Sequence, residues 1–128
     1  MARNPERVRA VGDDFETRAL QLLQRAGLIL LERNYGTRYG EIDLVMRDGD
    51  CAVFVEVRYR GSALQGGAAA SVGAGKRARL ARAAALYLQA HPALADRPCR
   101  FDVVAFDGAA ASAPAQWLQH AFEADAAT

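Results

Sequence analysis

Three carboxylates lie on two neighbouring strand-like segments near the middle of the chain. Glu41 and Asp43 belong to the segment GEIDLVM (residues 40–46), and Glu56 belongs to CAVFVEVRYR (residues 51–60). Both segments are otherwise apolar enough to be buried, so their acids need partners of opposite charge. Arginines could supply that charge in an ion-pair network. A hard cation such as Mg²⁺ could also do so, since it takes carboxylate, water and phosphate oxygens and promotes phosphoryl chemistry.

The turn between the two segments decides whether the three carboxylates meet. The residues Asp48-Gly49 are typical of a two-residue hairpin turn. With that turn, Glu41 lies opposite Glu56 at a Cβ separation of about 4.5–5.5 Å, and Asp43 lies diagonal to Glu56 at about 7–8 Å. All three acids then share one face, because side chains alternate across a strand. The residues expected on the opposite face of the first strand are Ile42, Leu44 and Met46.

The middle third of the chain is positively charged, although the protein as a whole is nearly neutral. The net charge is +1, yet residues 57–95 carry six basic residues and no acidic one. These are Arg58, Arg60, Lys76, Arg77, Arg79 and Arg82. Such a segment can bind the phosphates of a nucleic acid. The alternative for a run of charge is a solvated helix face.

Length and composition are typical of one globular domain. The chain has 128 residues, of which 52% are hydrophobic, enough for one core without disulfides. The two cysteines, Cys51 and Cys99, match neither a disulfide framework nor a metal-ligand spacing. No apolar run reaches membrane-spanning length, and the first residues lack the apolar run of a signal peptide. We therefore expect one domain, residues 1–128, in the cytoplasm and with no membrane partner.

Apolar spacing and turn residues predict the order α-β-β-β-α-β-β. The expected helices are residues 7–26 and 76–89, and the expected strands are residues 28–31, 41–47, 51–60, 101–106 and 115–119. Residues 34–36 are a predicted turn, and the glycine-rich residues 61–75 a predicted flexible loop. Residues 120–128 are expected to be loose. The predicted fold class is α/β, with a central mixed sheet flanked by helices and a core at about residues 11–106.

Residues 40–60 resemble the PD-(D/E)XK nuclease signature, in which an acid on one strand precedes Glu-X-Lys on the next. The chain resembles more closely the YraN-like family of uncharacterised small bacterial proteins. The segments that carry this resemblance are Gly12–Glu16 with Ala19, ERNY at 32–35, GEIDLV at 40–45, VFVEVRYR at 53–60, Lys76, RFDVV at 100–104 and AF at 121–122. Together these motifs are specific, whereas Glu-X-Lys alone is a weak signal.

The resemblance implies a restriction-endonuclease-like fold, near that of archaeal Holliday junction resolvases. It also implies Mg²⁺-dependent hydrolysis of phosphodiester bonds, with Mn²⁺ as a substitute. By position, Asp43, Glu56 and the carbonyl of Val57 would bind the metal. Glu16 would lie in or near the coordination shell, and Glu41 would be an accessory catalytic residue. The resemblance names no substrate. We expect nucleic acid as the partner, with branched or damaged DNA as one candidate substrate, and a homodimer as one expected form.

Arg58 stands where the signature has its catalytic lysine. Arginine binds phosphate well but cannot act as a base, because its pKa exceeds about 12. Arg58 could replace a lysine whose role was electrostatic, or Lys76, the sole lysine, could reach the site from the second helix. We therefore expect a metal-dependent endonuclease with Glu16, Glu41, Asp43, Glu56, Arg58 and Lys76 as its catalytic residues. The alternatives are a non-catalytic nucleic-acid-binding module with a degenerate site and a protein-interaction scaffold.

Overall fold

The computed structural model of the chain describes residues 5–60, 72–107 and 114–123, with side chains from residue 12 onward except that of Arg60. Its centre is one sheet of five strands in the order β1-β2-β3-β4-β5. The strands are β1 (Ile29–Thr37), β2 (Gly40–Asp48), β3 (Cys51–Arg60), β4 (Cys99–Asp107) and β5 (Ala115–Phe122). Strands β3 and β4 run parallel, and the other neighbouring pairs run antiparallel. The predicted α/β class with a mixed sheet flanked by helices is confirmed.

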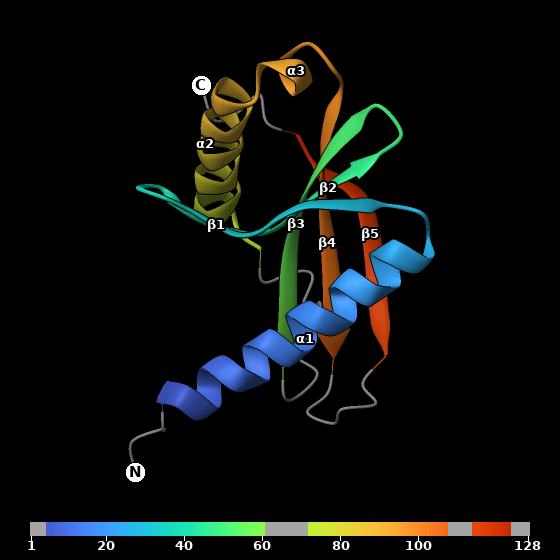
Figure 1. Cartoon of the computed structure of the whole chain (residues 1–128). Coiled ribbons are helices and arrows are strands. Elements are labelled where there is room, and N and C mark those ends of the chain that lie inside the picture. The colour runs from blue at the N-terminus through green and yellow to red at the C-terminus, as the bar shows by residue number, and fades with distance from the viewer. Residues whose placement is uncertain (1–4, 61–71, 108–113, 124–128) are drawn as a thin grey trace.

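Two helices cover opposite faces of the sheet (Figure 1). Helix α1 (Pro5–Arg25) crosses one face, where Phe15, Ala19 and Leu23 recur at helical spacing and are buried. Helix α2 (Ala74–Ala90) packs on the other face and is followed by the short helix α3 (Pro92–Ala95). The α2 side of the core includes Val45, Phe54, Leu80, Ala84, Tyr87, Phe101 and Val103. Each buried Leu or Phe contributes about 1.5–3 kcal/mol, so the core holds both helices in place.

No helix within the described ranges is both long enough and apolar enough to cross a membrane.

The hairpin turn between β2 and β3 lies one residue later than predicted. Asp48 pairs with Cys51, so the turn residues are Gly49 and Asp50 rather than Asp48 and Gly49. Gly49 has a φ of +58°, in the left-handed region that glycine adopts without strain. Gly-Asp and Asp-Gly are both permitted two-residue turns. Because the loop still contains two residues, the register moves by two and each side chain keeps its face.

Strand β2 departs from strict alternation around Asp43. Ile42 and Val45 both pack on the α2 side of the sheet, whereas Leu44 and Met46 pack on the α1 side. The prediction that Ile42 shares a face with Leu44 and Met46 is therefore wrong. Since Ile42 and Val45 are three positions apart, the strand must twist between them, and Asp43 lies within that twist.

Strand β1 extends further than its apolar run suggested. The prediction ended the strand at Leu31 and placed a turn at residues 34–36, but β1 continues to Thr37, which pairs with Gly40 of β2. Asn34 has a φ of +56°, a conformation that asparagine tolerates better than most residues. Residues 34–36 thus lie inside an irregular strand that continues to Thr37.

The last strand is also longer than predicted. We expected residues 120–128 to be loose, but β5 continues to Phe122. The Phe122 ring is buried and stacks on Phe101, with ring centroids 4.8 Å apart. This apolar contact is the physical reason why the strand continues. Residues 124–128 lie outside the described part of the chain, as do residues 61–71 of the predicted flexible loop.

Candidate metal centre

A pocket of about 480 Å³ opens between α1 and strands β1, β2 and β3. Its lining residues are Gly12, Asp13, Glu16, Asn34, Glu41, Asp43, Val57 and Tyr59. Glu16, Glu41 and Asp43 each place one carboxylate oxygen within 4.8 Å of the others. The pocket therefore gathers negative charge from one helix and one strand into a partly enclosed space.

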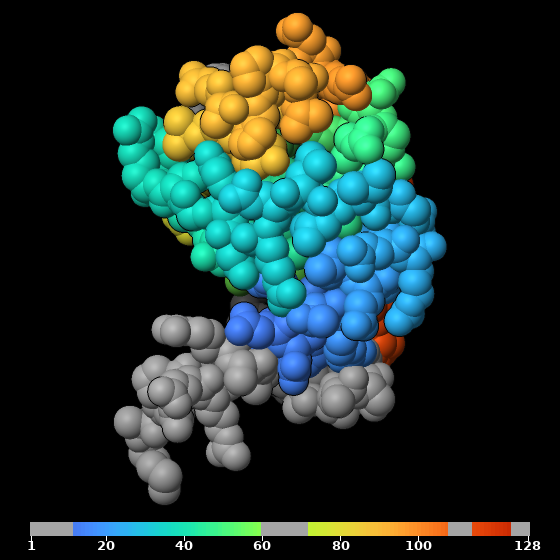
Figure 2. All heavy atoms as spheres, in the orientation of Figure 1, coloured from blue at the N-terminus to red at the C-terminus, as the bar shows by residue number. Residues whose placement is uncertain are grey.

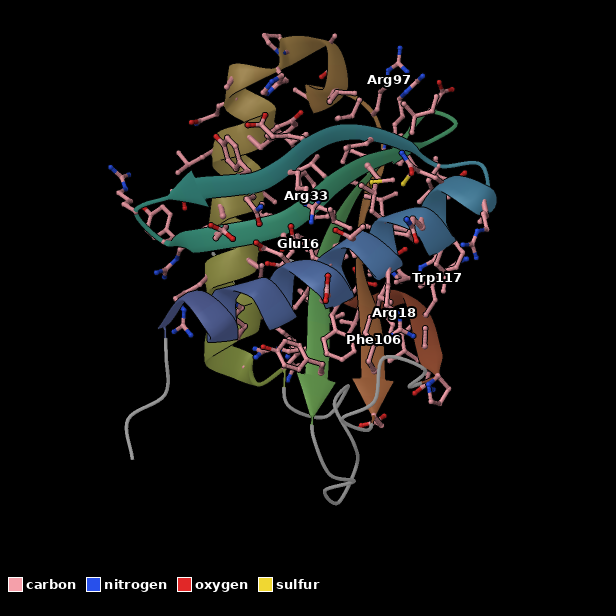
Figure 3. The ribbon with its side chains drawn as sticks, turned by 60° about the horizontal axis from the view of Figure 1, so that its bottom comes forward. Glu16, Arg18, Arg33, Arg97, Phe106 and Trp117 are labelled. Atoms are coloured by element: carbon pink, nitrogen blue, oxygen red, sulfur yellow. The ribbon has the colours of Figure 1, made fainter. Side chains whose placement is uncertain are left out.

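Glu16 enters the pocket because the core packing of α1 turns it toward the sheet. Its neighbour Phe15 and Ala19, one turn later, are buried, and Glu16 itself is only 7% exposed. Arg33 of β1 meets it, with Nε donating to Oε1 of Glu16 at 2.7 Å (Figure 3). Nη2 of Arg33 also donates to Oγ1 of Thr17 at 2.8 Å. Burial raises the pKa of Glu16, and the hydrogen bond from Arg33 partly opposes that rise.

Asp43 bridges from β2 to β3. The backbone pairs between these strands run from the hairpin turn as far as Leu44 and Val55, so Asp43 is the first residue beyond them. At this point the backbone N–H of Val57 donates to Oδ2 of Asp43 at 2.8 Å. If the register is extended by one pair, Asp43 lies opposite Glu56, in place of the predicted Glu41. A turn of two residues thus brings acids of β2 and β3 together, as predicted. The directly opposed acids are Asp43 and Glu56, whereas the prediction opposed Glu41 to Glu56.

The surroundings of Asp43 favour its protonated form. Burial raises its pKa to about 8, aided by a hydrogen bond with the Glu56 side chain and by the Glu56 charge. The N–H of Val57 and the charge of Lys76 act in the opposite direction and are weaker. Loss of solvent also raises the pKa of Glu41, together with the charges of Asp43 and Glu16. The acids of the pocket therefore lack sufficient positive charge, which a divalent cation would supply.

Glu56 faces two cations on the α2 side of the sheet. Its side chain is 4% exposed, and its Oε2 lies 3.3 Å from Nζ of Lys76 and 3.4 Å from Nε of Arg58. Lys76 lies in the first turn of α2, where a cation opposes the helix dipole. The Glu56 carboxylate offsets that cost. Lys76, the only lysine of the chain, thus reaches Glu56 from the second helix. This placement is the one predicted if Lys76 replaces the lysine that the signature has at position 58.

The arrangement differs in part from the residues implied by the nuclease signature. Asp43 and Val57 line the pocket, but Glu56 lies outside the group of three acids that Glu16, Glu41 and Asp43 form. The expected nucleic-acid-binding residues Arg77, Arg79 and Arg82 are exposed on α2. Arg60 ends β3, and its side chain lies outside the described part of the structure.

Asn34 and Asp13 also line the pocket, and the sequence interpretation missed both. A hydrogen bond from the Asn34 side chain lowers the pKa of Glu16 against the larger effect of burial. The signal was present, because Asn34 and Arg33 both belong to the ERNY segment. The predicted turn at residues 34–36 left Asn34 outside the strand that faces α1.

The sequence pattern of the uncharacterised protein family UPF0102 matches residues 15–106. The chain belongs to this family. The resemblance to YraN-like proteins is thereby confirmed, and the matched segment contains Glu16, Glu41, Asp43, Glu56 and Lys76.

Relatives in several bacteria match most of the chain. A UPF0102 protein of Stutzerimonas stutzeri is 52% identical over 112 residues, which are 88% of this chain and 93% of the relative. One of Pseudomonas putida is 53% identical over 113 residues, or 88% of this chain and 92% of the relative. One of Alkalilimnicola ehrlichii is 55% identical over 113 residues, or 88% and 86%. The family name carries no activity, so function must be argued from the pocket.

Proposed function

We propose that the protein binds nucleic acid and hydrolyses phosphodiester bonds as a Mg²⁺-dependent endonuclease, with branched or damaged DNA as its substrate. One observation carries the proposal: Glu16, Glu41 and Asp43 converge in one pocket, while the ammonium of Lys76 stands beside Glu56, whose side chain meets that of Asp43. An acidic pocket next to fixed cations is what phosphoryl chemistry needs. The mixed sheet between two helices also agrees with the nuclease fold that the signature implies.

The donor set of the pocket fits a hard divalent cation. Carboxylate oxygens suit Mg²⁺ and Mn²⁺, whereas softer metals prefer thiolates and imidazoles. Asp43 is the central ligand in this proposal, with Glu16, Glu41 or Glu56 and the Val57 carbonyl beside it. Burial, together with the hydrogen bond and the charge of Glu56, raises the pKa of Asp43 to about 8, so a cation beside its carboxylate would be stabilising. When bound, Mg²⁺ would acidify water and stabilise charge on a phosphoryl oxygen.

The side chains around the pocket divide the remaining work. Lys76 and Arg58 can donate hydrogen bonds to phosphate oxygens and stabilise the negative charge that develops there. Glu41 is exposed and lies next to the acids, so it can accept a proton from the attacking water. Arg58 cannot take that role, because guanidinium stays protonated.

The decisive experiment is metal-dependent cleavage by variants of the pocket. Asp43→Asn removes the central ligand with little change of shape, and Glu56→Gln removes the acid that holds Lys76. Each should lower the rate of cleavage with Mg²⁺ or Mn²⁺ by about 100-fold or more. Asp14→Asn is the matched control, since Asp14 is an exposed acid of α1 outside the pocket. Full cleavage by both pocket variants would overturn the proposal.

A second candidate is a nucleic-acid-binding module that does not cut. The observation that favours it is the convergence of Arg58 and Lys76 on the same oxygen of Glu56, which occupies both cations and neutralises the acid. This candidate predicts binding that weakens with salt and no turnover with either metal. Single-turnover assays with enzyme in excess over labelled DNA separate the two candidates.

A further inference from the structure

The β1–β2 hairpin forms a lobe beside α2 (Figure 2), and its tip shares a small hollow with the first half of that helix. Tyr39 occupies this tip, and two guanidinium groups approach its ring from different elements. Cζ of Arg38 is 5.0 Å from the ring centroid, and Cζ of Arg82 on α2 is 5.7 Å from it. Nη2 of Arg38 also donates to the Tyr39 hydroxyl at 3.1 Å. One aromatic ring therefore holds two cations that belong to separate parts of the fold.

The hairpin tip is itself held in shape by hydrogen bonds. The backbone N–H of Tyr39 donates to Oγ1 of Thr37 at 3.0 Å, and the same hydroxyl donates to the carbonyl of Gly40 at 2.8 Å. The ring of Tyr39 is consequently presented on a short, fixed turn. A fixed ring reduces the freedom that its arginine neighbours would otherwise lose on binding a ligand.

Among the residues that the structure describes, the arginines near this ring have no acidic partner. Arg33, Arg58, Arg97 and Arg100 each form an ion pair. Across the described ranges, Arg38, Arg79 and Arg82 form none. Like charges that gather around one ring repel each other unless an anion joins them. A guanidinium stacked on an aromatic ring keeps its N–H groups available in the plane, where they can grip a phosphate.

Glu41 connects this cluster to the acidic pocket. A small hollow between the hairpin and α2 is lined by Tyr39, Gly40, Glu41, Lys76, Arg79, Leu80 and Ala83. Glu41 lines both this hollow and the acidic pocket. The arginine cluster and the acidic pocket are therefore adjacent, with Glu41 between them.

We propose that Arg38 and Arg82, held on the ring of Tyr39 and joined by Arg79, bind a backbone phosphate of the nucleic-acid strand whose next phosphodiesters reach the acidic pocket. The inference rests on the nucleic-acid-binding part of the proposed function and not on hydrolysis. Contacts of this kind position a strand without reading its bases. Tyr39 is a positioning residue, because it acts through the two arginines.

The test is the salt dependence of binding to a labelled single-stranded DNA, measured by fluorescence anisotropy with the full chain and with EDTA present. Arg38→Ala and Arg82→Ala should each weaken binding, and the double variant should reduce the slope of log K against log salt by about 0.7, the value for one phosphate contact on a single strand, with a smaller reduction in each single variant. Tyr39→Phe should bind nearly as tightly as the parent, whereas Tyr39→Leu should lose affinity. Arg25→Ala is the matched control, because Arg25 is an exposed arginine at the end of α1, just before β1 begins and away from the hairpin tip.

Unchanged slopes for Arg38→Ala and Arg82→Ala, equal to that of Arg25→Ala, would overturn the inference. So would equal loss of affinity in Tyr39→Phe and Tyr39→Leu, because the ring would then have no role. A cleavage assay with Mg²⁺ on the same variants separates this result from the proposed hydrolysis. Reduced slopes without any cleavage support phosphate binding by Arg38 and Arg82 and count against the nuclease. Unchanged slopes with full cleavage refute this phosphate binding and leave the nuclease standing.

Discussion

Metal binding at the pocket should be coupled to the release of a proton from Asp43. Burial and the neighbouring Glu56 raise the pKa of Asp43 to about 8, so the group is mostly protonated at pH 7. A cation can bind the carboxylate only after that proton leaves. The apparent affinity for Mn²⁺ should therefore rise about tenfold per pH unit below pH 8 and level off above it. Between pH 6 and pH 9 the total gain should be about 100-fold.

Isothermal titration calorimetry provides the assay. Titrations of Mn²⁺ at pH 7 in two buffers of different ionisation enthalpy yield the number of protons released, and the raised pKa of Asp43 predicts the release of most of one proton per ion. Asp43→Asn should abolish this release. Glu56→Gln removes the group whose hydrogen bond and charge help to raise the pKa of Asp43, so the midpoint of the pH dependence should move below 8.

Two results would contradict the release of a proton from Asp43. An affinity for Mn²⁺ that stays constant from pH 6 to pH 9 would show that Asp43 carries no proton to displace. Equal proton release by Asp43→Asn and the parent would show that the proton comes from another group.

Two further predictions concern stability. The folded-state pKa of Asp43 lies above its ordinary value of 3.8, so its proton stabilises the fold; this contribution is complete below about pH 4 and is lost as the pH rises through about 8. Thermal melting without metal should therefore show a falling Tm from pH 6 to pH 9, and a smaller fall in Asp43→Asn. Elsewhere, buried Asp102 accepts hydrogen bonds from Nε of Arg100 at 3.1 Å and Nε1 of Trp117 at 2.9 Å. Asp102→Ala strands those donors and should cost about 3–5 kcal/mol in urea unfolding, whereas Asp96→Ala, an exposed acid, should change stability little.

The meeting of Asp43 and Glu56 could be predicted because it depends only on the parity of a two-residue turn. The residue directly opposite Glu56 could not be predicted, because Asp-Gly and Gly-Asp are both permitted turns and the choice between them moves the register by two. Cross-strand packing decides it, and the observed pairs set Val45 opposite Phe54 and Met46 opposite Val53. A shift of two keeps the parity of β2 and β3, so Asp43 and Glu56 still lie beside each other, although Ile42 packs on the face opposite to the predicted one.

The roles of Glu16 and Lys76 depend on how two helices lie on the sheet. The apolar stripe of α1 indicates which side of the helix is buried but not where along the sheet Glu16 will reach. Only the resemblance to a family pointed to it. For Lys76 the sequence raised the possibility, and the packing of Leu80, Ala84 and Tyr87 on the sheet brings its ammonium to Glu56. Long-range placement of this kind follows from core packing, which local patterns do not encode.

Asp43 and its acidic neighbours are proposed to hold a divalent cation. Anomalous diffraction from crystals grown with Mn²⁺ above pH 8 can locate that cation. We expect a strong anomalous peak in the acidic pocket, within bonding distance of a carboxylate oxygen of Asp43 and of at least one further acid of the site. A pocket with no anomalous peak, in crystals where Lys76 and Arg58 still hold Glu56, would contradict it.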